Sequence, residues 1–263
     1  MTLPRADPHD WKASAIETHS RQARDFAASY ESLEQDPFAS CFRYSRRRLD
    51  AILDRYLPSA PGPRLLDVGC GTGHYLSRLQ QRGFEVAGID GSEEMLARAR
   101  ESNPAADLRL ADVEALPFPD GQFDVVVSIE VLRYLADPRG ALAEMARVLR
   151  PGGVCLLTAT PVLNLNGYYL VNRLAAALPL GDLVRLKQYF TTSGRLRRRL
   201  ASAGFQEPRI HGVYLGPVNW VERIAPWALR PLLRRWEPLD ARLADAPLLR
   251  DLSNMFVARA VRR

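Results

Sequence analysis

The chain has 263 residues, a formal net charge of +6 and three cysteines, Cys41, Cys70 and Cys155. A chain of this length buries enough apolar surface to fold without a metal or disulfides, and the three cysteines have neither paired nor metal-ligand spacing. No apolar run reaches the roughly 18 residues of a membrane span, and residues 1–17 lack the apolar core of a signal peptide. We therefore expect a cytoplasmic chain without a metal site.

Residues 1–61 are predicted to be mainly helical. Apolar side chains recur at helical spacing in the first half of this region, and a second amphipathic helix is predicted for residues 44–57. Pro58 and the sequence Pro61-Gly62-Pro63 end that helix. Tyr30 is a candidate to contact a ligand, with a place in the core as the alternative.

The run from Leu65 to Gly73 predicts a buried strand that ends in a glycine-rich turn and opens a helix. Its glycines allow a sharp turn and leave no side chain to block a ligand, and free N–H groups at the helix start favour an anionic group. The spacing G-x-G-x-G differs from the dinucleotide pattern, because His74 stands where the last glycine would be. The turn therefore indicates a nucleotide-like ligand.

Acidic residues follow the next two predicted strands. Asp90 ends a strand that includes Phe84–Ala87, near the spacing of the acid that binds ribose in nucleotide-binding folds. Asp112 follows the short strand Leu108–Leu110 and could accept a hydrogen bond from the amine of adenine; capping of the next helix is the alternative. The apolar run Phe123–Glu130 is typical of a central parallel strand.

A helix is predicted for residues 138–149, ended by the sequence Arg150-Pro151-Gly152-Gly153, with a fifth strand at Val154–Thr160. Residues 161–190 are interpreted as an insertion at the carboxyl edge of the sheet, where open α/β sheets bind ligands. A further helix should start with Thr192 or Ser193 as its cap. We expect a pocket for a second ligand between the insertion and the N-terminal helices.

Residues 217–250 are predicted to form a capping segment. Its first part, residues 217–236, mixes tryptophan, other apolar residues and arginine, a composition that suits a membrane interface. Pro226 and Pro231 should interrupt a continuous helix there. We favour packing on the sheet edge or against an apolar pocket, with peripheral membrane contact as the alternative. Residues 253–262 alternate well enough to form the last strand.

Five sequence blocks, in this order and spacing, resemble class I S-adenosylmethionine-dependent methyltransferases that modify small molecules such as quinones, sugars, lipids and polyketides. The blocks are LLDVGCGTG at 65–73, GIDGSEEML at 88–96, ADVEALPF at 111–118, FDVVVSIEVLRYL at 123–135, and EMARVLRPGG ending at Gly153.

This resemblance implies an α/β fold with a Rossmann-like, seven-stranded, mostly parallel sheet and helices on both faces. Residues 1–61 would form a helical lid, and residues 62–263 the methyltransferase domain, with its insertion after strand 5. The last strand would pair antiparallel with a strand near Ile210–Val213.

The resemblance also implies which residues contact S-adenosylmethionine. The glycine turn would line its methionine end, Asp90 would hold the ribose, and residues after the third and fourth strands would flank the adenine and the transferred methyl group. The candidate cofactor-binding residues are Tyr30, Asp67, Gly69, Cys70, Gly71, Gly73, Asp90, Gly91, Met95, Asp112, Val113, Glu130, Val131 and Leu132.

The sequence indicates a general base less clearly than it indicates the cofactor-binding residues. The family often has a histidine where this chain has Tyr134, so no role of that histidine can be carried over. His19 and His74 are the candidate catalytic residues, with a surface or capping role as the alternative for each.

The expected function is methyl transfer from S-adenosylmethionine to an oxygen or nitrogen of a small, bulky or apolar metabolite. A nicotinamide-dependent oxidoreductase and a non-catalytic S-adenosylmethionine-binding partner protein are the alternatives. Arginine clusters such as Arg46-Arg47-Arg48 indicate solvated helix faces, or else attraction to an anionic substrate or membrane surface. Nucleic acid is disfavoured as a partner, because aromatic residues do not interleave with these clusters.

Overall fold

The computed structural model describes residues 8–177, 188–216 and 218–263. Its strands are β1 (Arg64–Val68), β2 (Glu85–Asp90), β3 (Asp107–Leu110), β4 (Phe123–Ser128), β5 (Leu149–Pro161), β6 (Phe190–Thr191), β7 (Phe205–Gly212) and β8 (Phe256–Arg262). Its α-helices are α1 (Pro8–Arg21), α2 (Ala23–Glu31), α3 (Cys41–Tyr56), α4 (His74–Gln80), α5 (Glu93–Ser102), α6 (Arg139–Val148), α7 (Tyr168–Ala177), α8 (Ser193–Ser202), α9 (Val218–Ile224) and α10 (Pro226–Leu243).

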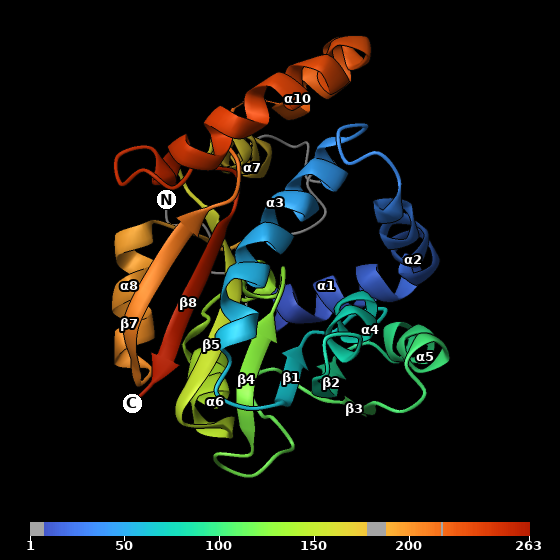
Figure 1. Ribbon diagram of the computed structural model, residues 1–263, viewed down its shortest axis with the longest axis vertical. Helices are drawn as coiled ribbons and strands as arrows, with labels where there is room; N and C mark the ends of the chain where they lie inside the picture. The colour runs from blue at the N-terminus through green and yellow to red at the C-terminus, as the bar shows by residue number, and fades with distance from the viewer. Residues whose placement is uncertain (1–7, 178–187, 217) are drawn as a thin grey trace.

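The strands form a sheet in the order β3-β2-β1-β4-β5-β8-β7 (Figure 1), and the two-residue β6 pairs with the end of β5. The first five strands in this order are parallel, and β8 runs antiparallel to both β5 and β7. The predicted α/β, Rossmann-like sheet and its antiparallel C-terminal hairpin are confirmed. The strand order reverses between β1 and β4, and open sheets of this kind bind ligands at that switch point.

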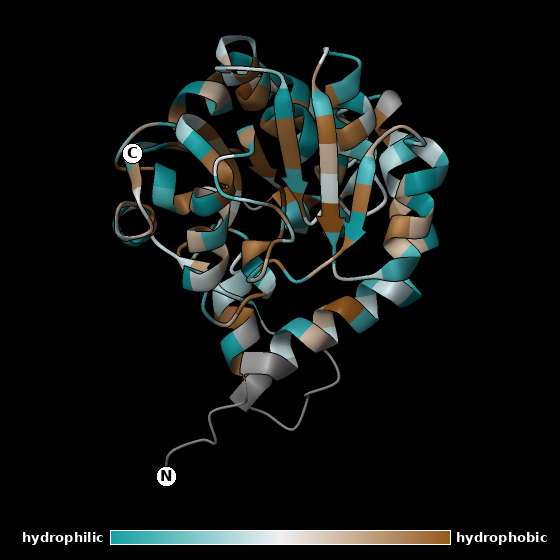
Figure 2. Cartoon of the chain, turned by 90° about the horizontal axis from the view of Figure 1, so that it is seen from below, coloured by the Kyte–Doolittle hydropathy of each residue, from teal (hydrophilic) through white to brown (hydrophobic). Residues whose placement is uncertain are grey.

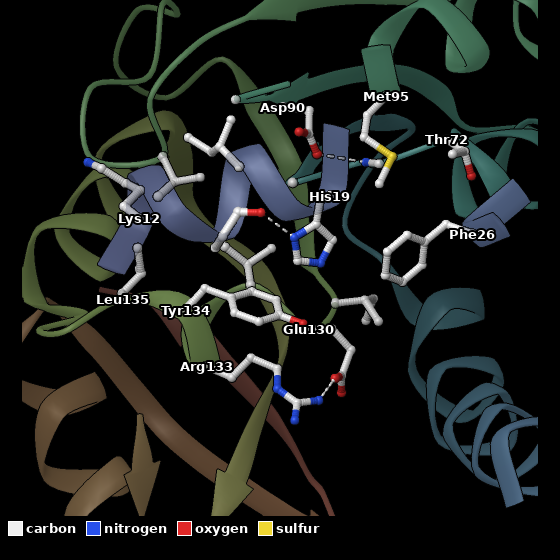
Figure 3. A pocket seen from close by; sticks show the side chains of 18 of the residues that line it. Lys12, His19, Phe26, Thr72, Asp90, Met95, Glu130, Arg133, Tyr134 and Leu135 are labelled. Carbon is white, nitrogen blue, oxygen red and sulfur yellow. Dashed lines mark hydrogen bonds and ion pairs between the residues drawn. The ribbon is translucent and has the colours of Figure 1, made fainter. Parts of the chain in front are cut away.

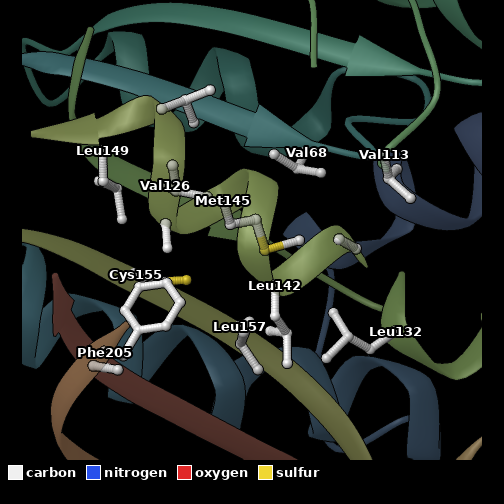
Figure 4. Close-up of a cluster of buried hydrophobic side chains, with 14 of the residues drawn as sticks. Val68, Val113, Val126, Leu132, Leu142, Met145, Leu149, Cys155, Leu157 and Phe205 are labelled. Carbon is white, nitrogen blue, oxygen red and sulfur yellow. The ribbon is translucent and has the colours of Figure 1, made fainter. Parts of the chain in front are cut away.

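Helices cover both faces of the sheet, because the central strands alternate apolar side chains between the two sides. Val126, Cys155 and Leu157 point into a cluster shared with Leu142 and Met145 of α6 (Figure 4). Figure 1 shows α3 lying across the opposite face, where it contributes to a second cluster together with residues of α4 and α10. In Figure 2 the strands in view carry brown, hydrophobic segments between white and teal ones.

Two predicted boundaries differ from the structure. Helix α6 ends at Val148, as its stop signal requires, but the backbone is already strand from Leu149 onward, so β5 contains the Pro-Gly-Gly sequence. Pro226 does begin a new helix, yet Pro231 and Pro238 lie inside α10. Each proline removes one backbone hydrogen bond, and burial of Leu229 and Leu233 against the core offsets that loss.

The variable segments are only partly described. Helix α7 belongs to the predicted insertion, whereas residues 178–187 of that insertion and residue 217 of the C-terminal segment lie outside the described residues. Thr192 caps α8, as one of the two alternatives predicted, by accepting a hydrogen bond from the Arg195 amide. Among the described helices, none has both the length and the apolar character that crossing a bilayer requires.

Candidate active site

A cavity of about 590 Å³ opens at the switch point between β1 and β4 (Figure 3). Its floor is formed by the turn after β1, the end of β2 and the loops after β3 and β4, and its walls by side chains of α1, α2 and α3. Segments far apart in the chain therefore meet around one cavity. The spacing of the sequence motifs predicted only the part of this cavity that the sheet and its loops form.

The glycine turn brings backbone to the cavity floor. Gly69 and Gly71 have φ values of 79° and 54°, in the left-handed region that favours glycine. A Cβ atom at Gly69 would lie 2.2 Å from Cγ2 of Val131, whereas one at Gly71 would have no protein atom within 4 Å. Gly69 is thus required for packing of the loop after β4, and Gly71 leaves its side of the cavity open.

Asp90 is held in place by the backbone around it. Its Oδ2 accepts a hydrogen bond from the Gly71 amide and its Oδ1 accepts one from the Ser92 amide, each at 2.9 Å. Burial raises the pKa of Asp90, although these two N–H groups work in the opposite direction. A carboxylate oxygen can accept more than one hydrogen bond, so Asp90 keeps acceptor capacity toward the cavity that it lines.

Helix α1 is fastened over the cavity at two points. Lys12 Nζ donates to Oε2 of Glu114 at 2.8 Å and also to the carboxylate of Asp112, while the hydroxyls of Ser20 and Ser92 lie 2.8 Å apart. Asp112 itself accepts from the Glu114 amide, so its carboxylate shapes a turn and does not cap an α-helix. Polar contacts thus fix the N-terminal helix to the loops that follow β2 and β3.

Glu130 occupies a strained position directly after β4. Its φ is 64°, which is uncommon for a residue with a side chain and is often associated with functional sites. Its amide donates to Oγ1 of Thr158 at 2.6 Å, and its carboxylate pairs with Arg133. Burial alone would raise the pKa of Glu130, but the guanidinium groups of Arg133 and Arg46 outweigh it and hold the pKa below its ordinary value. Glu130 therefore places a negative charge at the cavity wall.

His19 presents one ring nitrogen to the cavity. The distance from its Nδ1 to the carbonyl oxygen of Ala15 is 2.6 Å, and a carbonyl can only accept, so Nδ1 carries the proton. Nε2 is then the basic nitrogen. The ring stacks on Phe26, with centroids 5.0 Å apart, and meets the ring of Tyr134 edge-on at 4.8 Å (Figure 3). The imidazole is thus held in one orientation and one tautomer.

The other candidate histidine has a different environment. His74 stacks on Tyr30, with ring centroids 4.8 Å apart, and is not among the residues that line the cavity. Burial, together with the charges of Arg78 and Arg46, lowers the pKa of His74 to about 4. His74 is therefore neutral and supports Tyr30, which does line the cavity.

Comparisons with known proteins agree with this architecture. A family model described as a methyltransferase domain matches residues 66–157. The demethylmenaquinone methyltransferase of Thermus thermophilus is 36% identical over 188 residues, which cover 64% of this chain and 83% of that protein. The chain belongs to the class I S-adenosylmethionine-dependent methyltransferases.

Other relatives of this methyltransferase chain match over a shorter part. The malonyl-[acyl-carrier protein] O-methyltransferase of Serratia marcescens is 37% identical over 145 residues, so the match spans only 55% of each chain. Among solved structures, magnesium protoporphyrin IX methyltransferase from Synechocystis has a TM-score of 0.62 and 15% identity, covering 95% of this chain and 100% of that chain. At that identity the likeness establishes the fold.

Most of the predicted site residues of the methyltransferase chain come together. The candidates that line the cavity are Tyr30, Gly69, Gly71, Asp90, Gly91, Met95, Asp112, Val113, Glu130, Val131 and, as a possible base, His19. The candidates that do not line it are Asp67, Cys70, Gly73, Leu132 and His74. Asp67 is buried within β1, and burial, with the nearby charge of Asp90, raises its pKa to about 7. Ligand contact by all of these candidates stays a prediction.

Several lining residues were not among the candidate site residues predicted from the sequence. Lys12, Phe26, Phe42 and Arg46 come from the N-terminal helices, and Arg133 from the loop after β4. One signal was present for Arg46, which lies four residues after Phe42 and three before Leu49, on the apolar face of α3. The predicted insertion contributes no lining residue among its described part, but Tyr189 donates its amide to the carbonyl of Arg133.

Proposed function

We propose that this chain binds S-adenosylmethionine in the cavity and transfers its methyl group to an oxygen or nitrogen of a small metabolite. The observation that carries the proposal is the pairing of the left-handed glycine turn with the backbone-held carboxylate of Asp90 at the switch point of the sheet. An acidic group at the end of β2 is suited to accept hydrogen bonds from both ribose hydroxyls.

The remaining lining residues fit the rest of that cofactor. Met95, Ala111 and Val113 offer apolar contacts for a flat base, and Asp112 offers an acceptor for its amine. The ionised carboxylate of Glu130 gives the cavity a negative charge suited to a sulfonium. S-adenosylmethionine, when bound, supplies an electrophilic methyl group and a good leaving group.

The chain's own contribution is then mainly alignment and exclusion of water. Positioning of two reactants can lower a barrier by about 7–11 kcal/mol. Helix α1, fastened by Lys12 and Ser20, closes the cavity from one side and supports this role. If the acceptor is a hydroxyl, Nε2 of His19 is the group suited to take its proton, because Nδ1 is committed to Ala15.

The acceptor itself is proposed only as a class. Aromatic side chains of Phe26, Phe42 and Tyr134 line the cavity and suit an apolar or ring-bearing molecule. The relatives named above are a demethylmenaquinone methyltransferase and a malonyl-[acyl-carrier protein] O-methyltransferase, so their names do not agree on one acceptor. Family membership disfavours the nicotinamide alternative.

Calorimetry with S-adenosylmethionine and S-adenosylhomocysteine tests cofactor binding directly. We expect micromolar affinity for both and none for NADH. Incubation of the protein with radiolabelled S-adenosylmethionine and separate quinone, glycoside and lipid extracts then tests transfer. Binding without transfer to any extract would favour the non-catalytic alternative, and absence of cofactor binding would refute the proposal.

We also propose peripheral contact between α9–α10 and an anionic lipid surface. Ile224 and Trp227 are 78% and 82% exposed. Residues 218–235 contain several arginines and only one acidic residue, Glu222, so the segment is basic. The carboxylate of Glu222 accepts a hydrogen bond from the Cys41 amide. Tryptophan and arginine together suit a membrane interface.

Sedimentation with vesicles tests this contact. Binding to phosphatidylglycerol vesicles should exceed binding to phosphatidylcholine vesicles and should fall in the double variant Ile224→Ser, Trp227→Ser. The matched control is Leu248→Ser, which removes an equally exposed apolar side chain outside the segment. Equal sedimentation of both variants would refute the contact.

A further inference from the structure

Arg46 is a buried cation without an acidic partner. Its side chain on α3 is only 6% exposed, and its Nε and Nη1 atoms are buried with no hydrogen-bond partner among the described residues. The guanidinium carbon lies 5.1 Å from the ring centre of Phe42 and 5.6 Å from that of Tyr30. Aromatic faces attract a cation but do not accept the in-plane hydrogen bonds that a guanidinium offers.

The acids closest to Arg46 are engaged elsewhere. Glu130 pairs with Arg133, and Asp50 pairs with Arg78. Arg133 also lines the cavity, but its guanidinium already contacts Glu130 and donates to Oε1 of Gln188 at 2.8 Å. Within the described part of the chain, Arg46 is thus the cavity-lining arginine that forms no ion pair, and the charges of Glu130 and Asp50 act on it only from beyond contact distance.

A buried, unpaired charge is unfavourable in the empty protein. Such a group persists when a ligand supplies the missing partner, and a guanidinium matches a carboxylate or phosphate with two parallel hydrogen bonds. Arg46 also borders a second hollow, which three further arginines line together with the carboxylates of Asp50, Asp54 and Glu237. The complementary anion is placed in the main cavity because Arg46 lines it and the proposed cofactor carries a carboxylate.

We propose that Arg46 is an anion-binding residue that pairs with a carboxylate-type group of a molecule bound in the main cavity. The inference rests on the proposed function, because two sources of that group follow from it: the amino-acid carboxylate of the cofactor, and an acidic group on the acceptor. Tyr30 connects Arg46 to His74 beside the glycine turn, which favours the cofactor as the source.

Calorimetry on three variants separates the sources. Arg46→Met keeps the length and apolar stem of the side chain without its charge, Arg46→Lys keeps the charge, and Arg47→Met is the matched control at an exposed position that pairs with Glu237. The ligands are S-adenosylhomocysteine, which has the carboxylate, and 5′-methylthioadenosine, which lacks the amino-acid part.

If the cofactor is the source, Arg46→Met should weaken S-adenosylhomocysteine binding by about tenfold or more and change methylthioadenosine binding less than about twofold. Arg46→Lys should restore part of the loss. If the acceptor is the source, S-adenosylhomocysteine binding is unchanged, but inorganic phosphate binds to the wild-type complex with S-adenosylhomocysteine and not to the Arg46→Met complex.

A purely structural role is separated by thermal melting of the unliganded protein. Arg46→Met should melt at the same temperature as the wild type or higher, because it removes a buried charge that forms no ion pair. Unchanged affinity for both S-adenosylhomocysteine and phosphate would overturn the inference. Failure of the wild type to bind either nucleoside would instead refute the proposed function.

Discussion

Lys12 on α1 and Glu114 in the loop after β3 form an ion pair with a distance of 2.8 Å between Nζ and Oε2. The pair joins the N-terminal helices to the rim of the cavity, and the same ammonium group also contacts Asp112. Burial alone would lower the pKa of Lys12, but hydrogen bonds to the two carboxylates raise it above its ordinary value. Ion pairs of Lys12 therefore hold α1 against the loop after β3, at the rim of the cavity.

Lys12→Met should loosen α1. Partly exposed ion pairs contribute about 0.2–1 kcal/mol each, so loss of two should weaken S-adenosylmethionine binding by about fivefold. Amide exchange in α1 should accelerate, with exchange in β1 and β4 unchanged. Arg21→Met is the control, since its pair with Glu17 lies within α1 and is well exposed. An equal effect of both variants would contradict the role of the Lys12 contacts.

Asp90→Asn should weaken cofactor binding by about tenfold, because an amide accepts only through its oxygen and cannot hold the Gly71 and Ser92 amides while also serving two ribose hydroxyls. Asp90→Ala should bind still more weakly. Calorimetry measures both, with Asp107→Asn as a surface control that breaks the pair with Arg109. Unchanged affinity would remove Asp90 from the ribose site.

Two glycine substitutions should separate folding from binding. Gly69→Ala should lose about 3 kcal/mol in the free energy of unfolding, because its methyl group collides with Val131 and its φ is left-handed. Gly71→Ala has the backbone strain but no collision, so it should lose about 1 kcal/mol while its methyl group enters the cavity and weakens cofactor binding. Denaturant melts and calorimetry check both; equal stability losses would contradict this assignment.

His19→Gln should reduce kcat by about 10²–10⁴ on a hydroxyl acceptor, with KM for S-adenosylmethionine nearly unchanged, because a general base acts on the chemical step. Tyr134→Phe keeps the edge-on ring contact with His19 and should retain most activity. If kcat of His19→Gln equals that of the wild type, His19 is not the base.

Asp67 should make stability depend on pH. Its ordinary pKa is 3.8 and burial raises the folded-state pKa to about 7, so between these values the folded protein binds one more proton than the unfolded chain. The free energy of unfolding should therefore fall as the pH rises from about 4 to 7, by a few kcal/mol at most. Asp67→Asn should lack this part of the decline in urea melts at pH 5 and pH 8. Parallel pH profiles for the two proteins would contradict the raised pKa.

The sequence predicted the strands of the sheet well, because the features that mark each strand lie within a few residues of one another. The apolar run Phe123–Ser128, the glycine turn after β1 and the acid at Asp90 each depend on neighbours within a few residues, and each lies where the sequence indicated. The mostly parallel sheet and its antiparallel last strand followed from the family resemblance together with these signals.

The part of the site formed by the N-terminal helices was harder to predict, because it depends on how segments far apart in the chain pack together. Nothing near Lys12 indicates that it reaches Asp112, and the run Arg46-Arg47-Arg48 does not reveal that Arg46 alone of the three forms no ion pair. Pro231 gave a local signal against helix that tertiary burial of its neighbours overrode. The surroundings of these residues are set by contacts between segments far apart in the sequence, and not by local composition.

Strand β8 lies between β5 and β7, although it follows both along the chain. During synthesis, the parallel part of the sheet can assemble early, whereas β7 has no strand to pair with until residues 256–262 have left the ribosome. The open edge of β5 is exposed to other nascent chains for that interval. Chaperone dependence of this protein should therefore concentrate in the interval between the synthesis of β5 and that of β8.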